Sequence, residues 1–293
     1  MNQEKIIDEF KRCKKDPIHF ICNYVKIVHP VLGTTNFNLF PFQKRIVKNL
    51  LNHRFNLLRK FRQAGATTIA CAVGLWLSVF HKNKTVVILS IGDTESTEVL
   101  ERIKLMYDEL PAFLKPGLLG DNKHTLKLLN GSTIKSRPSS RTAGRSLAGS
   151  LLIIDEAAFI ENIEKLWESV YPILSTGGRA FVLSTVNGTG NWFYKLYKGA
   201  KNNENSFNAV DINWREHPMY FRTDGYQWLY DVLEKQNPPI CVDKWMEVTK
   251  SNLSFKSWRQ EYECIAEDTI ITLRDKETGE IKEIMIGEAY KCL

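Results

Sequence analysis

Apolar positions along the chain fall into two patterns. Short uninterrupted apolar runs predict strands buried on both faces of a sheet, and longer stretches with apolar residues three or four positions apart predict amphipathic helices. The two patterns alternate through most of the sequence. Strands that alternate with helices favour right-handed crossovers and a parallel sheet, so the expected fold class is α/β, a mostly parallel sheet flanked by helices.

Individual elements follow from these patterns. The sequence Asn130-Gly131-Ser132 predicts a hairpin turn between two strands at 125–129 and 133–136. The other expected strands lie at 54–59, 85–90, 151–156 and 180–185. Helices are expected at 3–28, around Gln43 to Ile46, from the 62–68 turn to about 79, near 94–110 and near 161–172.

The run 151–156 reads Leu-Leu-Ile-Ile-Asp-Glu, four aliphatic residues followed by two carboxylates. The aliphatic residues suit a strand buried in a parallel sheet, and ligands bind at the carboxyl edge of such a sheet. At that edge one of the two carboxylates, Asp155 or Glu156, would bind Mg²⁺ and the other would polarise a water molecule for attack on a phosphate. The alternative is a strand followed by a helix whose first turn favours acids.

Residues 60–68, Lys-Phe-Arg-Gln-Ala-Gly-Ala-Thr-Thr, lie between a predicted strand and an apolar helix, the context that a phosphate-binding P-loop requires. Backbone N–H groups at the helix N-terminus would bind phosphates, and the Thr67 hydroxyl would bind Mg²⁺. Ala66 occupies the usual lysine position, so Lys60 or Arg62 would supply the missing positive charge. The alternative is a degenerate loop that binds nucleotide without hydrolysing it.

Composition narrows the class of protein. A chain of 293 residues with 43% hydrophobic content has enough apolar side chains for a large core and more than one structural unit. It has no apolar run of about 18 residues and no apolar core near its N-terminus, so we expect neither a membrane span nor a signal peptide. Six scattered cysteines without paired spacing favour a reducing compartment and argue against a disulfide framework or a structural zinc site.

The positive charge is concentrated at the N-terminal end. The formal net charge is +7, and residues 1–63 hold 13 Lys/Arg against 4 Asp/Glu. Such an excess suits contact with DNA or with nucleotide phosphates. A solvated helix face that carries Lys11, Arg12, Lys14 and Lys15 is the alternative.

Residues 211–263 are helical and aromatic in pattern, and they predict a small helical lid subdomain. Its tryptophans, at 214, 228, 245 and 258, are expected to form a core rather than a base-stacking surface. The expected domains are an N-terminal helical segment at 1–36, a P-loop core at 37–210, the helical subdomain at 211–263 and a C-terminal fragment at 264–293.

Taken in order, the motifs resemble those of the large terminase subunit of tailed bacteriophages, the ATPase that pumps DNA into a procapsid. The resemblance covers about residues 37–263. Residues 37–45 are similar to the family's adenine-recognition segment, 60–68 to its deviant Walker A loop and 153–160 to its Walker B segment.

This resemblance implies ATP and Mg²⁺ as cofactors. It implies that Asp155 binds Mg²⁺ together with Thr67 and that Glu156 is the catalytic carboxylate. It favours Lys60 as the phosphate-binding lysine, since some members carry the lysine at the start of the loop. The nucleotide-binding residues that it implies are Gln43, Lys60, Arg62, Gln63, Gly65, Ala66, Thr67 and Thr68.

Residues 182–190, Val-Leu-Ser-Thr-Val-Asn-Gly-Thr-Gly, resemble the family's coupling motif. The resemblance implies that Ser184, Thr185 and Asn187 sense the γ-phosphate and relay hydrolysis to motion. Val186 stands where proline is usual in the family. The alternative is an ordinary strand-to-turn segment.

Arg145 lies ten residues before Asp155 in a Gly/Ser-rich loop and matches an arginine of the family. The resemblance makes it a candidate catalytic arginine finger, acting on its own nucleotide or on that of a neighbouring subunit in a ring. Arg141 competes for this role, and a solvated loop arginine is the alternative.

From Cys264 the sequence departs from the terminase pattern, which in complete members continues into a nuclease domain, and resembles the N-terminal block of an intein. The Cys264 thiol would attack the carbonyl of Glu263 and convert the peptide bond to a thioester, the first step of protein splicing. Two strands joined by a turn at 276–279 are expected. Residues 275–293 hold no histidine, so the intein would be half of a split intein or the product of a truncated frame. The alternative is a β-hairpin with an unrelated cysteine.

The function expected from sequence is therefore the ATP-hydrolysing motor domain of a phage large terminase in the host cytoplasm. The resemblance implies double-stranded DNA, the portal protein, the small terminase subunit and further copies of the chain in a ring as partners. A split intein adds a second chain that carries the C-intein and the nuclease domain, and no membrane partner is expected. The competing functions are a helicase-like DNA translocase and a non-hydrolysing nucleotide-binding scaffold.

Overall fold

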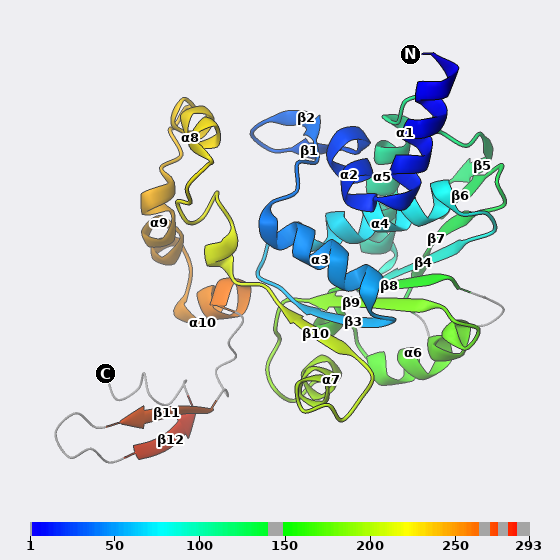
Figure 1. Ribbon diagram of the computed structural model, residues 1–293. Helices are drawn as coiled ribbons and strands as arrows, with labels where there is room; N and C mark the ends of the chain where they lie inside the picture. Colours follow the sequence, from blue (N-terminus) through cyan, green and yellow to red (C-terminus); the bar gives the residue numbers. More distant parts are fainter. Residues whose placement is uncertain (1, 140–148, 264–269, 275–280, 286–293) are drawn as a thin grey trace. The chain divides into compact units, whose positions relative to one another are not determined.

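A computed structural model of the chain describes residues 2–139, 149–263, 270–274 and 281–285 (Figure 1). The chain divides into two compact units. The first unit comprises Met1–Leu58, Gly65–Ser184 and Ser206–Val210, and the second comprises Arg59–Ala64, Thr185–Asn205 and Asp211–Leu293. Two of these divisions fall inside the predicted phosphate loop and the predicted coupling motif.

Eight strands form one sheet, in the order β10-β3-β9-β8-β4-β7-β6-β5. β4 pairs in parallel with β8 and with β7, and β8 pairs in parallel with β9. β6 pairs antiparallel with β7 and with β5, so the sheet is mixed but mostly parallel, which confirms the α/β class. The strands are β3 (Phe55–Arg59), β4 (Thr85–Ser90), β5 (Leu118–Asn122), β6 (Thr125–Leu128), β7 (Thr133–Pro138), β8 (Leu151–Asp155), β9 (Arg179–Ser184) and β10 (Asn208–Asp211).

Between their first and last residues, the central strands β4, β8 and β9 are apolar. All five residues of β8 are buried, as are the last five residues of both β4 and β9. Aliphatic side chains on both faces are what a strand covered on both sides requires. The last residues of these strands are nevertheless polar: Ser90, Asp155 and Ser184.

Helices cover both faces of the sheet. The connection from β4 to β7 and the connection from β8 to β9 cross the sheet in opposite directions, so right-handed crossovers place α5 and α6 on opposite faces. α4 packs beside α5 and beside α3, and Figure 1 shows these three helices on one face and α6 on the other. The bounds are α3 (Pro41–Asn52), α4 (Ala66–Phe80), α5 (Asp93–Asp108) and α6 (Ile163–Val170).

The helix predicted over 3–28 is wrong in its extent. It is two helices, α1 (Gln3–Lys15) and α2 (Pro17–Tyr24), followed by the antiparallel hairpin of β1 (Lys26–His29) and β2 (Gly33–Asn36). The break lies at Asp16, because the ring of Pro17 disfavours helical backbone in the residue before it. The Asp16 carboxylate instead accepts hydrogen bonds from the backbone N–H groups of Ile18 and His19, at 2.9 and 3.0 Å, and so caps α2.

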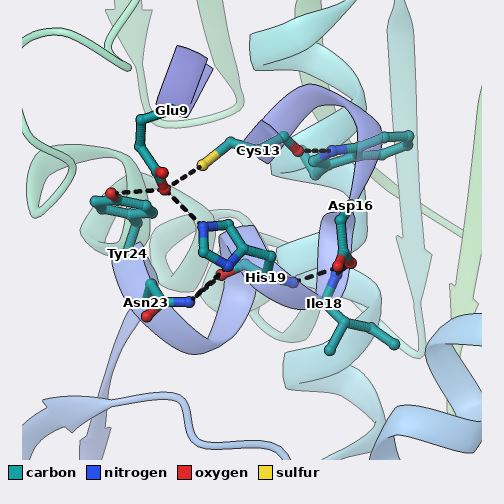
Figure 2. A network of polar contacts seen from close by, with 8 residues as sticks. Glu9, Cys13, Asp16, Ile18, His19, Asn23 and Tyr24 are labelled. Carbon is teal, nitrogen blue, oxygen red and sulfur yellow. Dashed lines mark hydrogen bonds and ion pairs between the residues drawn. The ribbon is translucent and has the colours of Figure 1, made fainter. Parts of the chain in front are cut away.

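One carboxylate joins α1 to α2 (Figure 2). Glu9 Oε1 lies 2.6 Å from His19 Nε2 and accepts hydrogen bonds from the Tyr24 hydroxyl at 2.9 Å and from the Cys13 thiol at 3.6 Å. The hydrogen bond from His19 lowers the pKa of Glu9, and burial raises the pKa of Cys13 to about 12, so the thiol stays protonated and serves as a donor. Glu9, Cys13 and His19 are residue types that can bind a metal ion. The Glu9 Oε1 atom, however, already accepts hydrogen bonds from Cys13, His19 and Tyr24. These hydrogen bonds give the cluster a structural role, which is to hold α1 against α2.

Two further strands were not predicted, β5 and β10. β5 is an edge strand of the sheet and ends in Gly-Asp-Asn, so it shows no apolar alternation. β10 has four residues, too few for periodicity to separate it from a turn.

The second unit contains α7 (Trp192–Lys201), α8 (Gln227–Glu234), α9 (Trp245–Asn252) and α10 (Phe255–Trp258), with a single turn of π-helix at Arg259–Glu263. Its aromatic side chains stack on one another. The ring centroids of Tyr220 and Trp245 lie 4.0 Å apart, and those of Trp258 and Tyr262 lie 4.9 Å apart. Trp214 and Trp258 are buried, which confirms the predicted core, but Trp228 is 52% exposed and does not belong to it.

Near the C-terminus, β11 (Ile270–Arg274) and β12 (Ile281–Met285) pair antiparallel, with Ile270 opposite Met285 and Arg274 opposite Ile281. This confirms the predicted pair of strands. Within the described part of the chain, no helix has the length and apolar character needed to cross a membrane.

We predict that Glu9→Gln lowers the free energy of unfolding at pH 7 by about 0.5–1 kcal/mol, because the neutral amide accepts weaker hydrogen bonds than the carboxylate. The pKa of Glu9 is lowered in the folded protein, so its contribution is complete above the ordinary value of 4.5 and is lost as the pH falls below it. Urea unfolding should therefore show a difference at pH 7 that disappears near pH 3.

The exposed Glu98 of α5 offers a matched control, because Glu98→Gln should change stability little at either pH. Equal effects of Glu9→Gln at both pH values would contradict the assignment of Glu9 as a charged acceptor.

Candidate nucleotide-binding site

The N-terminus of α4 follows a sharp backbone turn. Gly65, the residue before the helix, has φ +74°, in the left-handed region that favours glycine. Its carbonyl accepts a hydrogen bond from the N–H of Ile69 at 2.9 Å. Small residues, Ala66 and Thr67, open the helix, so its first N–H groups form the kind of terminus that binds phosphate.

The side chain of Gln43, from α3, lies against this turn. Gln43 is buried, its Oε1 accepts a hydrogen bond from the N–H of Phe40 at 3.0 Å, and its Nε2 lies 2.8 Å from the position that a Cβ on Gly65 would occupy. The structure thus brings Gln43 beside the phosphate loop. Its predicted contact with adenine stays a prediction.

Thr67 and Asp155 meet although 88 residues separate them. The Thr67 hydroxyl donates to Asp155, at 3.1 Å from Oδ1 and 3.0 Å from Oδ2, and Asp155 is buried at the end of β8. These oxygens fit the predicted Mg²⁺. Adjacent ligands of an octahedral Mg²⁺ ion, each about 2.1 Å from the metal, lie about 3 Å from each other, and Mg²⁺ prefers oxygen ligands.

Glu156 occupies a strained backbone position at the tip of β8. Its φ of 51° and ψ of 43° lie in the left-handed region, which costs a non-glycine residue about 1–3 kcal/mol. Its N–H donates to Asp155 Oδ1 at 3.1 Å. Residues held in such conformations cluster at functional sites.

Ser184, at the end of β9, connects the neighbouring strand to Glu156. Its hydroxyl accepts a hydrogen bond from the N–H of Ala158 at 3.1 Å and lies 3.4 Å from Glu156 Oε2, to which it donates. β8 and β9 pair in parallel with Asp155 opposite Leu183, so their carboxyl ends lie side by side. The first unit therefore joins Gln43, Gly65, Thr67, the acid pair and Ser184 in one site.

The first part of the predicted loop packs within the second unit. Lys60 is buried, whereas the Arg62 side chain is 65% exposed. The Arg62 guanidinium lies 3.3 Å from a carboxylate oxygen of Glu261, and its backbone N–H donates to the Glu261 carbonyl at 2.6 Å. Gln63 has φ +63° and accepts a hydrogen bond from the Tyr220 hydroxyl at 2.9 Å. Sequence reasoning missed Glu261 and Tyr220, since no local signal pairs them with a loop more than 150 residues earlier.

The remaining candidates have different surroundings. Thr185 is buried and Asn187 is exposed, and both belong to the second unit. Arg141, Arg145 and Cys264 lie outside the described residues, so their predicted roles stay predictions.

Residues 58–280 match the family model described as the terminase large subunit, T4likevirus-type, N-terminal. The chain belongs to this terminase family. The match begins in β3, immediately before the phosphate loop, and includes both carboxylates and the coupling motif. It also runs past Cys264, so it places no family boundary at that residue.

Solved terminase structures share the fold. The ATPase domain of the Thermus phage P74-26 large terminase matches with 18% identity and a TM-score of 0.51, over 77% of this chain and 98% of that one. The HK97 bacteriophage large terminase matches with 14% identity and a TM-score of 0.65, over 88% and 56%. The large terminase of a thermophilic bacteriophage, solved in complex with ADP, matches with 11% identity and a TM-score of 0.57, over 79% and 55%. The chain thus spans about half the length of the HK97 terminase and of the terminase solved with ADP.

For this terminase chain we predict that Gly65→Ala destabilises more than Gly33→Ala. Both positions have positive φ, which costs alanine about 1–2 kcal/mol, but only the new Cβ at Gly65 meets a neighbour, Gln43 Nε2. Moving Gln43 breaks its bond to the N–H of Phe40, so Gly65→Ala should cost about 1 kcal/mol more in urea unfolding.

Combining Gly65→Ala with Gln43→Ala should cost less than the sum of the single changes, because the clash is then absent. Strict additivity would show that Gln43 does not restrict residue 65.

Proposed function

We propose that this chain is the ATP-hydrolysing motor part of a large terminase that drives double-stranded DNA into procapsids. The observation that carries the proposal is the contact of Thr67 with Asp155 beside the N-terminus of α4. This contact lies beside a helix N-terminus that could bind phosphate, and its oxygens could bind a cation. Family membership and the fold shared with a phage terminase solved in complex with ADP support the same nucleotide class.

Each residue then has a role that its geometry allows. Thr67 and Asp155 would hold Mg²⁺, which when bound would neutralise charge on the phosphate oxygens. The N–H groups that follow Gly65 would bind the phosphates, and Gln43 would contact the base. Glu156, oriented by its own backbone and by the Ser184 hydroxyl, would position the attacking water and accept its proton.

Coupling and assembly extend the proposal. Ser184, Thr185 and Asn187 would report the state of the γ-phosphate to the rest of the motor, and Arg145 or Arg141 would complete the site as an arginine finger. The motor would work as a ring on the portal protein with the small terminase subunit, in the host cytoplasm.

We predict that Glu156→Gln lowers kcat for Mg²⁺-dependent ATP hydrolysis by about 10²–10⁴-fold while ADP affinity changes little, because the general base is lost and the binding groups remain. Glu161→Gln, an exposed neighbour, is the matched control and should keep the wild-type rate. Lys60→Ala should also abolish turnover and Arg62→Ala should not, because the resemblance to terminases favours the lysine at the start of the loop as the phosphate contact.

The outcomes separate the competing functions. ADP binding without any turnover in the wild-type chain would contradict the motor and support a scaffold. ATP-dependent strand unwinding would instead identify a helicase-like translocase. Activity lost with Arg62→Ala and kept with Lys60→Ala would transfer the phosphate contact to Arg62.

A second proposal concerns residues 264–293, where we infer the N-terminal part of an intein. The antiparallel pair of β11 and β12 supports it, because the predicted block contains two such strands after the cysteine. The Cys264 thiol would attack the Glu263 carbonyl, break the C–N bond to its own amino group and form a thioester. A complementary polypeptide with the remaining intein and the nuclease domain would complete splicing.

We predict that hydroxylamine at neutral pH cleaves the full chain between Glu263 and Cys264, because it attacks the thioester there. Its slower cleavage at Asn130–Gly131 and Asn187–Gly188 should be the same in every variant. Mass spectrometry should detect the 1–263 fragment in the wild type and not in Cys264→Ala, with Cys241→Ala as the matched control. An uncleaved wild-type chain would contradict thioester formation by this fragment alone and leave a plain hairpin.

A further inference from the structure

The Asp211 carboxylate, at the end of β10, joins three side chains of the second unit. It accepts hydrogen bonds from Arg59 Nε at 2.7 Å and from the Tyr197 hydroxyl at 2.8 and 2.7 Å, and it lies 2.7 Å from Lys201 Nζ. The Arg59 guanidinium also lies over the Tyr197 ring, 4.5 Å from its centroid. Sequence reasoning identified none of these four residues as a group, because they come from three elements that are distant in sequence.

The charges favour an ionised Asp211. Burial raises the pKa of its carboxyl, but the hydrogen bonds from Lys201 and Tyr197 and the positive charges of Arg59 and Lys201 outweigh burial and lower the pKa. Exposed ion pairs contribute little to stability one at a time, and these side chains are about one third to one half exposed. We therefore expect the network to act mainly by fixing the relative positions of the segments that it joins.

The first of those segments is the entry to the phosphate loop. Arg59 is the last residue of β3 and is held twice, by its side chain on Asp211 and by its carbonyl, which accepts the N–H of Ile212 at 3.1 Å. The next residue is Lys60, the candidate phosphate-binding lysine. Fixing both groups of Arg59 sets where the Lys60 backbone begins.

The second segment is α7, which follows the coupling motif. Asn191 caps this helix by accepting the N–H of Tyr194 at 2.9 Å, and its amide donates to the carbonyls of Asn187 and Gly188 at 2.5 and 3.2 Å. The N-terminal end of α7 is thus bonded to the coupling motif. Four residues apart on one face of its C-terminal half, Tyr197 and Lys201 reach Asp211.

We propose that Asp211 is a positioning residue through which the coupling motif and the phosphate loop act on each other. A helix of ten residues is a stiff rod about 15 Å long, so a displacement at Asn187 reaches Tyr197 and Lys201. Asp211 passes it to Arg59 and hence to Lys60. This inference rests on the proposed ATPase function and adds a route between two of its parts.

A double-mutant cycle on ATP turnover by the full chain tests the route, since only coupling measurements establish one. Asp211→Asn removes the charge and keeps the size, and we expect it to lower kcat about tenfold. Adding Asn187→Ala should then lower kcat by at least fivefold less than it does in the wild-type chain, because the path is already broken. Asp211→Glu, which restores the charge, should recover part of the rate.

Asp243 offers a matched control in the same unit, because its carboxylate accepts a hydrogen bond from Arg222 Nε at 2.9 Å and touches none of the proposed path. Asp243→Asn should leave kcat unchanged, and its effect should multiply independently with that of Asn187→Ala. If thermal unfolding shows that the Asp211→Asn variant is not folded, Tyr197→Phe is used in its place. This change removes the hydroxyl that donates to Asp211 and keeps the ring.

The result that overturns the inference is an active wild-type enzyme in which the Asp211 and Asn187 effects simply multiply. A wild-type chain that binds ADP and never turns ATP over would instead reject the proposed function. The two failures are therefore distinguishable in one set of assays.

Discussion

The Thr67 hydroxyl lies about one hydrogen-bond length from both oxygens of Asp155, and the candidate site is built around this contact. It joins the first turn of α4 to the end of β8, two elements that are distant in sequence. A helix N-terminus attracts phosphate by its free N–H groups, and a buried carboxylate beside a hydroxyl attracts a hard cation. Nucleoside phosphates with bound Mg²⁺ require both attractions at once.

The apolar character of the sheet explains why the polar groups lie where they do. β4, β8 and β9 are buried on both faces, so a polar side chain inside them would lose its hydration without a partner. Their ends are the first positions where such a side chain is tolerated. Parallel pairing of β8 with β9 aligns these ends, and the Ser184 hydroxyl therefore meets Glu156.

Backbone strain at Glu156 and the close approach at Gly65 have a common cause. Both residues have positive φ and both stand where a buried element turns abruptly toward the site. At position 65, glycine adopts the positive φ easily. It also has no Cβ, which would otherwise clash with the Gln43 side chain. Glu156 adopts the strained conformation with a full side chain, and residues held in such conformations cluster at functional sites.

Local patterns were sufficient for much of this protein. Six strands of the large sheet and the terminal hairpin follow from runs of apolar residues and from turn residues, because burial and backbone preference act over a few positions. The ordered motifs were also sufficient for the terminase family. The single helix predicted at 3–28 was wrong, because Pro17 disfavours helical backbone at Asp16 and ends α1 there.

Only the tertiary structure decided which distant groups meet. The pairing of Thr67 with Asp155, of Arg62 with Glu261 and of Asp211 with Arg59, Tyr197 and Lys201 depends on strand order and helix packing, which no local pattern encodes. The sequence by itself determined which side chains have the chemistry to bind a nucleotide and its metal ion. Folding determined their neighbours, because contacts between distant segments arise from the burial of the whole core rather than from any one segment.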